Sequence, residues 1–197
     1  MHSRLDILAQ VASDILSRTE EPVESDILNS AHWKDSPIVN TPTITQEELY
    51  RRQGADDYVL KEVRRNSKGF GTVSEKIVIN ILGLGPRTSS QNDATWNGWK
   101  IEIKCARIWV AKSKNNDCVW QHIEENHDFD YIIFAFLDLH GWKVWGMLKK
   151  DLFSETLLNK KVIVRQGNQG WWACKSALLP YMTPIKTAAD LPLIGPL

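Results

Sequence analysis

The chain has 197 residues, which is long enough for one domain with a sizeable hydrophobic core. No apolar run approaches the length that spans a membrane, and the three cysteines match no metal-binding spacing, so we expect a cytoplasmic protein with reduced thiols. The 24 acidic and 24 basic residues balance, which argues against a protein that binds nucleic acid through net charge alone.

The charge is unevenly distributed along the chain. Residues 1–50 contain nine acidic and three basic side chains, whereas the rest of the chain contains 21 basic and 15 acidic ones. A basic body that follows an acidic N-terminal arm is compatible with a DNA-binding cleft on the body.

The N-terminal residues have the pattern of a helix followed by an irregular arm. Apolar residues at helical spacing predict a helix over residues 5–16. Residues 19–44 are rich in Pro, Ser, Asp and Glu, which predicts an irregular arm that packs on the body or on a second subunit; disorder is the alternative.

Two short helices are expected after the arm. Thr45 and Glu48 form a capping-box pattern that predicts a helix start, and Gly54 separates this helix from a second one over residues 56–65. A basic cluster follows, which is either a solvated helix end or a set of phosphate contacts; it consists of Lys61, Arg64, Arg65 and Lys68.

A longer helix is predicted over residues 72–84, after a flexible joint at Gly69-Phe70-Gly71. Gly83 marks its end. Glu75 lies three residues after Thr72, so it is either a capping-box glutamate or a functional carboxylate.

The most informative stretch is residues 91–109. Charged and apolar side chains alternate between residues 100 and 105, which predicts a strand with its apolar face against a core. Asn97-Gly98 predicts a tight turn that folds this strand and the preceding segment into a hairpin. The hairpin would bring Asp93 beside Glu102.

A hairpin of this kind would form an oxygen-rich site with an ammonium group next to it. The carboxylates of Asp93 and Glu102 suit magnesium better than zinc, and Lys104 lies two residues beyond Glu102. The alternative is an amphipathic strand whose exposed face carries a solvated ion pair.

Asp93 followed by Glu102-Ile103-Lys104 resembles the signature of the PD-(D/E)XK nucleases, which include type II restriction endonucleases and the mismatch-repair nicking endonuclease. Asn92 stands where the family has a proline. The resemblance covers roughly residues 71–147. It implies that Asp93, Glu102 and the backbone carbonyl of Ile103 hold Mg²⁺, that Lys104 orients the attacking water, and that Glu75 is the extra helix carboxylate of some members.

The expected fold is α/β and restriction-endonuclease-like, with a mixed sheet of four or five strands flanked by helices. Residues 131–137 are nearly all apolar and predict the central buried strand, and His140-Gly141 predicts a turn into an alternating strand over 142–147. The remaining elements are expected as short helices over 118–123, 149–158 and 176–181 and a strand over 162–165. We expect an arm at 1–44, a nuclease domain at 45–183 and an extended tail at 184–197.

The candidate DNA contacts are basic and amide side chains: Lys68, Arg107, Lys112, Lys114, Arg165, Gln166, Asn168 and Gln169. An amide side chain can donate to and accept from adenine together, so the loop 165–170 is a candidate for base reading in the major groove. An ordinary polar turn is the alternative for this loop. Most of the nine tryptophans are expected in the core, and His122 and His127, which have no partner at metal spacing, at the surface.

Taken together, these patterns predict a magnesium-dependent, sequence-specific DNA endonuclease that acts on double-stranded DNA as a homodimer. The alternatives are a repair nickase or junction resolvase of the same fold, a catalytically silent DNA-binding protein, and a partner-binding protein that uses the acidic arm.

Overall fold

The computed structural model describes residues 44–109 and 117–191. The helix predicted at 5–16, the arm up to residue 43, and the candidate DNA contacts Lys112 and Lys114 lie outside this part of the chain. None of the helices in the described part combines the length and apolar character that a membrane span needs.

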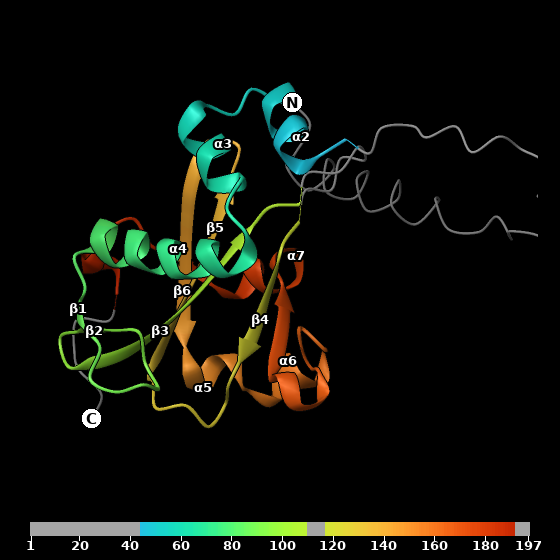
Figure 1. Ribbon diagram of the computed structural model, residues 1–197. Helices are drawn as coiled ribbons and strands as arrows, with labels where there is room; N and C mark the ends of the chain where they lie inside the picture. The colour runs from blue at the N-terminus through green and yellow to red at the C-terminus, as the bar shows by residue number, and fades with distance from the viewer. Residues whose placement is uncertain (1–43, 110–116, 192–197) are drawn as a thin grey trace, which may run out of the picture. The chain divides into compact units, whose positions relative to one another are not determined.

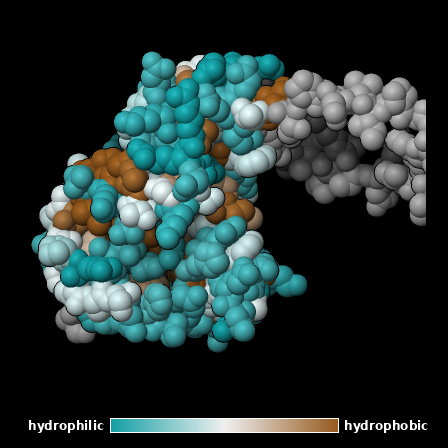
Figure 2. All heavy atoms as spheres, viewed as in Figure 1, coloured by the Kyte–Doolittle hydropathy of each residue, from teal (hydrophilic) through white to brown (hydrophobic). Residues whose placement is uncertain are grey.

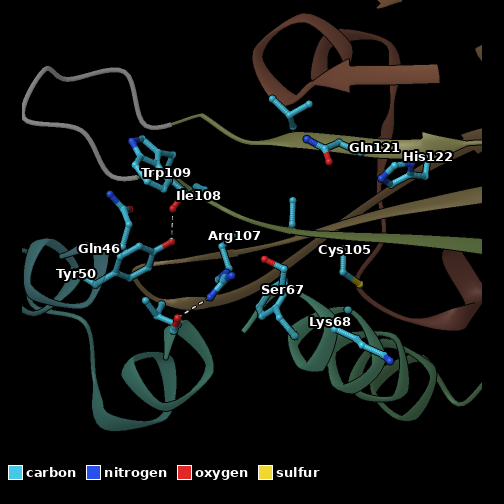
Figure 3. Close-up of a pocket in the computed structure, with 15 residues that line it drawn as sticks. Gln46, Tyr50, Ser67, Lys68, Cys105, Arg107, Ile108, Trp109, Gln121 and His122 are labelled. Carbon is cyan, nitrogen blue, oxygen red and sulfur yellow. Dashed lines mark hydrogen bonds between the residues drawn. The ribbon is translucent and has the colours of Figure 1, made fainter. Parts of the chain in front are cut away.

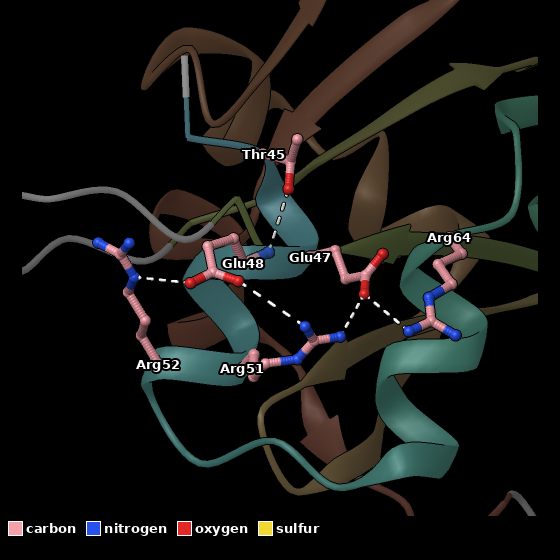
Figure 4. A network of polar contacts seen from close by, with 6 residues as sticks. All are labelled: Thr45, Glu47, Glu48, Arg51, Arg52 and Arg64. Carbon is pink, nitrogen blue, oxygen red and sulfur yellow. Dashed lines mark hydrogen bonds and ion pairs between the residues drawn. The ribbon is translucent and has the colours of Figure 1, made fainter. Parts of the chain in front are cut away.

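Two short helices open the described chain, as the sequence predicts. Helix α2 (Gln46–Arg52) begins at Thr45, whose hydroxyl accepts a hydrogen bond of 3.2 Å from the Glu48 N–H. Helix α3 (Asp57–Val63) begins at Asp56, whose carboxylate accepts from the Val59 N–H at 2.8 Å. The two helices are joined by an ion-pair network in which Glu47 binds both Arg51 of its own helix and Arg64 (Figure 4).

Helix α4 (Ser67–Leu82) begins earlier than the sequence predicts. The Asn66 side chain caps it by accepting a hydrogen bond of 2.7 Å from the Gly69 N–H, so the predicted flexible joint at residues 69–71 lies inside the helix. Each glycine costs a helix about 1 kcal/mol relative to alanine. Burial of Phe70 between Trp142 and the Arg107 guanidinium offsets this cost. The helix ends at Gly83, which has the left-handed conformation expected of it.

The main sheet has six strands, and its members follow the order β1 (Gly85–Pro86), β2 (Ala94–Trp96), β3 (Trp99–Arg107), β5 (Tyr131–Asp138), β6 (Gly141–Leu148) and β9 (Thr183–Pro184). Strands β3 and β5 run parallel, and all other neighbours run antiparallel (Figure 1). Every residue from Tyr131 to Leu137 is buried, which confirms that this is a central strand. The mixed α/β class is therefore confirmed, with more strands than the four or five expected.

A second sheet of three strands was not expected. It has the order β4 (Val119–Ile123), β8 (Trp171–Cys174) and β7 (Ile163–Arg165). The prediction of a helix over residues 118–123 is wrong, because this segment pairs with β8 and buries Trp120 against Phe134 and Phe136 of β5.

Alternate residues of β5 belong to two hydrophobic clusters, one on each face of the main sheet. On one face, α4 contributes Val78 and Leu82, and Figure 1 shows this helix lying across the strands. The other face is covered by the small sheet and by three short helices, α5 (Lys149–Leu152), α6 (Glu155–Asn159) and α7 (Lys175–Leu178). The single helix predicted over 149–158 is thus two helices.

The segment after β9 packs on the same face as α4. Ile185, Ala188 and Leu191 are buried there, and the Ile185 N–H donates to the Val144 carbonyl at 2.9 Å. The extended tail predicted from residue 184 is therefore wrong for residues 184–191, because three apolar side chains find a site on the sheet.

Tyr50 joins α2 to the ends of two main-sheet strands. Its side chain is 1% exposed, and its hydroxyl donates to the carbonyls of Ile108, at 2.6 Å, and Leu137, at 3.2 Å. The contact fixes α2 against the point where β3 and β5 end.

We predict that Tyr50→Phe lowers the free energy of unfolding by roughly 1–3 kcal/mol, because it leaves a buried carbonyl without its donor. Chemical denaturation followed by circular dichroism measures the change. Tyr181→Phe is the matched control, since Tyr181 is 41% exposed and its hydroxyl meets only Lys160 at 3.4 Å. Equal stabilities for both variants would contradict the anchoring role of Tyr50.

Candidate active site

The predicted hairpin is present and places Asp93 beside the middle of β3. Asn97 and Gly98 have φ values of 46° and 84°, the left-handed pair that a tight two-residue turn needs. Ala94 pairs with Ile101, and the Asp93 N–H donates to the Ile101 carbonyl at 2.8 Å. Asp93 is thus the first residue beyond the paired part of the hairpin.

The Asp93 carboxylate continues the hairpin where the backbone pairing stops. Its Oδ2 accepts a hydrogen bond of 2.7 Å from the Ile103 N–H. Asn92, which is 1% exposed, holds the preceding turn through hydrogen bonds to Thr88 and Ser89. These bonds fix the approach to Asp93.

Glu102 and Lys104 form an ion pair of 2.7 Å on one face of β3. Glu102 is only 4% exposed, so the alternative of a solvated surface pair is wrong. Burial raises the pKa of the Glu102 carboxyl, the Lys104 charge lowers it, and the nearby Asp93 charge raises it again. A buried carboxylate is therefore held beside one cation and one like charge.

Glu75 projects from the interior of α4, well after its first turn, so the capping-box interpretation of this residue is wrong. The Thr72 hydroxyl instead bonds the Lys68 carbonyl within the helix. Burial raises the pKa of Glu75, and the charges of Asp93 and Glu102 raise it further. Three carboxylates, from α4 and from both arms of the hairpin, therefore act on one another.

The donor set suits a hard divalent cation. Asp93, Glu102 and the Ile103 carbonyl offer oxygen atoms only, which magnesium prefers. Mutual repulsion and burial penalise the ionised carboxylates, and a bound cation would relieve that penalty. Within residues 44–109 and 117–191, however, no three His, Cys, Asp or Glu side chains are grouped closely enough to ligate one metal by themselves. A metal would thus need the backbone carbonyl or water in addition to the carboxylates.

The other predicted site residues are dispersed. Arg107 donates to the carbonyls of Val63 and Arg65, at 2.5 and 2.8 Å, and so caps the end of α3. Of the basic cluster, Arg64 pairs with Glu47 and Arg65 with Glu62, whereas Lys68 lies exposed at the start of α4. The DNA contacts proposed for Arg107 and Lys68 stay predictions.

Residues 165–170 form a tight connection between β7 and β8. The Gln166 N–H donates to the Gly170 carbonyl at 2.9 Å, and Arg165, Gln166, Asn168 and Gln169 are all exposed. A Cβ on Gly170 would come within 2.8 Å of the Ile123 carbonyl, so close packing on β4 explains this glycine. Base reading by this loop stays a prediction, and the loop lies on the small sheet rather than on the β2–β3 hairpin.

A cavity of about 620 Å³ lies at the end of β3, beyond Lys104, and was not predicted from the sequence. It is lined by residues from α4, the end of β3 and β4, including Lys68, Cys105, Gln121 and His122 (Figure 3). The adjacent polar residues Gln121 and His122, which break the alternation of β4, were the available sequence signal. The expectation that His122 lies at the surface is confirmed.

A scan against protein-family models finds no match for the chain, and a search of curated proteins finds none either. The site assignment therefore rests on the residues and on the geometry described above.

We predict that Glu75→Gln stabilises the fold at about pH 8 but not at about pH 4, near the ordinary glutamate pKa. The folded-state pKa of Glu75 is raised, so at low pH the carboxyl is protonated in both states. As the pH rises through that raised pKa, the parent loses stability that the variant keeps.

Thermal denaturation across this pH range measures the difference, at ~2–4 °C for each kcal/mol in a chain of this size. Glu155→Gln, at an exposed position in α6, is the matched control. A Glu75→Gln effect that is the same at every pH would contradict the crowding of the three carboxylates.

Proposed function

We propose that the protein is a magnesium-dependent endonuclease that hydrolyses phosphodiester bonds of double-stranded DNA, of the type II restriction class. The observation that carries the proposal is the cluster on the hairpin, where Asp93 is bonded to the backbone between Glu102 and Lys104. The basic surplus of the chain beyond residue 50 supports a polyanionic substrate. On this proposal, the mixed sheet is arranged as in the PD-(D/E)XK nucleases.

Each residue of the cluster has a role that follows from its surroundings. Asp93, Glu102 and the Ile103 carbonyl would hold Mg²⁺, which supplies a bound water of lowered pKa and positive charge near the phosphate. Glu102 keeps the Lys104 ammonium in place, 2.7 Å away. Lys104 then orients the attacking water and stabilises the negative charge that develops on the phosphate.

Hydrolysis adds this water to phosphorus and breaks the bond to the 3′ oxygen, which takes up a proton. The products are a 5′-phosphate and a 3′-hydroxyl, as the family resemblance implies. Glu75 contributes a third negative charge from α4, so its removal would alter the charge that a cation meets at the site.

We predict that Asp93→Ala and Lys104→Ala each reduce the cleavage rate of plasmid DNA by at least ~10²–10³, because each removes charge from the reacting centre. Agarose gels of time courses with Mg²⁺ measure the rate, and circular dichroism verifies that the variants are folded.

The chain offers a matched control on the same strand. Lys100 and Asp128 form an ion pair of 2.6 Å whose side chains are 38% and 53% exposed. Lys100→Ala and Asp128→Ala should therefore cut DNA at close to the parent rate. Cleavage by Asp93→Ala within a factor of about ten of the parent, well short of the expected loss, would remove Asp93 from the active site.

We also propose that the enzyme is a homodimer, because a two-fold assembly matches a palindromic site and lets each subunit cut one strand. Sedimentation of the complex should then show two chains of 22.5 kDa on each DNA duplex, after the mass of the DNA is subtracted. A monomer on DNA, with nicked circles as the final product, would instead identify a nickase.

A further inference from the structure

The cavity at the end of β3 has a mainly apolar lining whose charged side chains are basic. Among the described residues that line it, Lys68 and Arg107 are charged and none is acidic. Because Arg107 donates to the backbone carbonyls of Val63 and Arg65, Lys68 is the cation that a ligand in the cavity could reach. The charge of the cavity is thus complementary to a phosphate-bearing ligand.

Along β3, the lining of the cavity begins one residue beyond Lys104 of the proposed active site. Cys105, Ala106 and Arg107 line it, and they directly follow Lys104 in the strand. A DNA strand that runs past the carboxylates along β3, from Lys104 towards Arg107, would therefore reach the cavity next.

A β-bulge directs two polar side chains of β4 towards the cavity. The pairing of β4 with β8 shifts register between Trp120 and Ile123, so Gln121 and His122 are both exposed although they are adjacent. His122 has a φ of 56°, a left-handed conformation that costs a residue with a side chain of order 1–3 kcal/mol. Bulges recur where a strand re-aims a side chain at a functional site.

Exposed apolar groups complete the lining. Hydrophilic side chains predominate on the face drawn in Figure 2, where the hydrophobic ones form separate patches. Trp109, which is 66% exposed, and Val119, which is 40% exposed, both line the cavity. An exposed indole ring offers a face on which a nucleobase can stack.

We propose that this cavity receives the DNA next to the cleaved phosphate, and that Gln121 and His122 contact base edges while Lys68 contacts a phosphate. The inference rests on the proposed nuclease function. The Gln121 amide can both donate and accept, as reading of a base edge requires, whereas the Lys68 ammonium supplies charge without sequence information. The cavity, and not the loop 165–170, is then the site that determines sequence preference nearest the cut.

The test is to digest one genomic DNA preparation with each variant and to sequence the fragment ends. Gln121→Ala should relax the base preference at one or two positions and cut the preferred sequence roughly 5- to 150-fold more slowly. Gln53→Ala, at an exposed glutamine outside the cavity, is the matched control and should keep the parent's preference. Gln169→Ala tests the competing loop.

A second measurement separates phosphate contact from base contact. In fluorescence anisotropy, Lys68→Ala should weaken binding to a random-sequence duplex as much as binding to the preferred sequence. The slope of the logarithm of the binding constant against the logarithm of the salt concentration should become smaller by about one. Gln121→Ala should bind this random duplex almost as the parent does.

The outcomes are distinct. Unchanged preference and rate for Gln121→Ala, or relaxed preference in Gln169→Ala alone, overturns the cavity as the reading site. A parent that binds duplex DNA without cutting it refutes the nuclease; the cavity proposal then survives only if Lys68→Ala weakens that binding. A parent that neither cuts nor binds DNA overturns both.

Discussion

The hydrogen bond from the Ile103 N–H to the Asp93 carboxylate is the contact on which the candidate site depends. Strand pairing between β2 and β3 ends at Ala94 and Ile101, and beyond it this bond and the one from the Asp93 N–H to the Ile101 carbonyl hold the two arms together. Without it, the repulsion between Asp93 and Glu102 would favour their separation. The side chains of Asn92 and Glu102 are buried on either side of the bond, and this burial restricts the conformations that the two arms of the hairpin can adopt.

The same arrangement places ionisable carboxyl groups in buried or partly buried positions, where charged groups are usually unfavourable. Glu102 is buried with a single cationic partner, and Glu75 is partly buried near two further carboxylates. Buried like charges destabilise a fold unless a counter-charge is present. The main sheet can tolerate this cost because β5, next to β3, is buried along nearly its whole length and anchors the strand on its other side. A carboxylate fixed on a rigid strand, with two others near it, suits a cation-binding site.

The sequence predicted those features whose signals are local. The Asn97-Gly98 turn and the alternation of residues 100–105 specify the hairpin within some ten residues, and the capping box at Thr45 specifies the start of α2 in the same way. Features that depend on distant contacts were missed. Gly69 and Gly71 were interpreted as a flexible joint. The contacts of Phe70 with Trp142 and Arg107, which stabilise this part of the helix, come from distant parts of the chain and leave no local signal. Strand β4 was read as a helix because its pairing partner lies some fifty residues further along the chain and a bulge breaks its alternation.

The most direct test of the account is to incubate the purified chain with supercoiled plasmid and Mg²⁺ and to determine the chemistry of the ends. A site built from Asp93, Glu102 and Lys104 predicts cleavage that stops when the metal is chelated, and ends that DNA ligase can rejoin because they carry a 5′-phosphate and a 3′-hydroxyl. Cleavage that persists in chelator, ends that carry a 3′-phosphate, or no cleavage with either Mg²⁺ or Mn²⁺ would contradict the account.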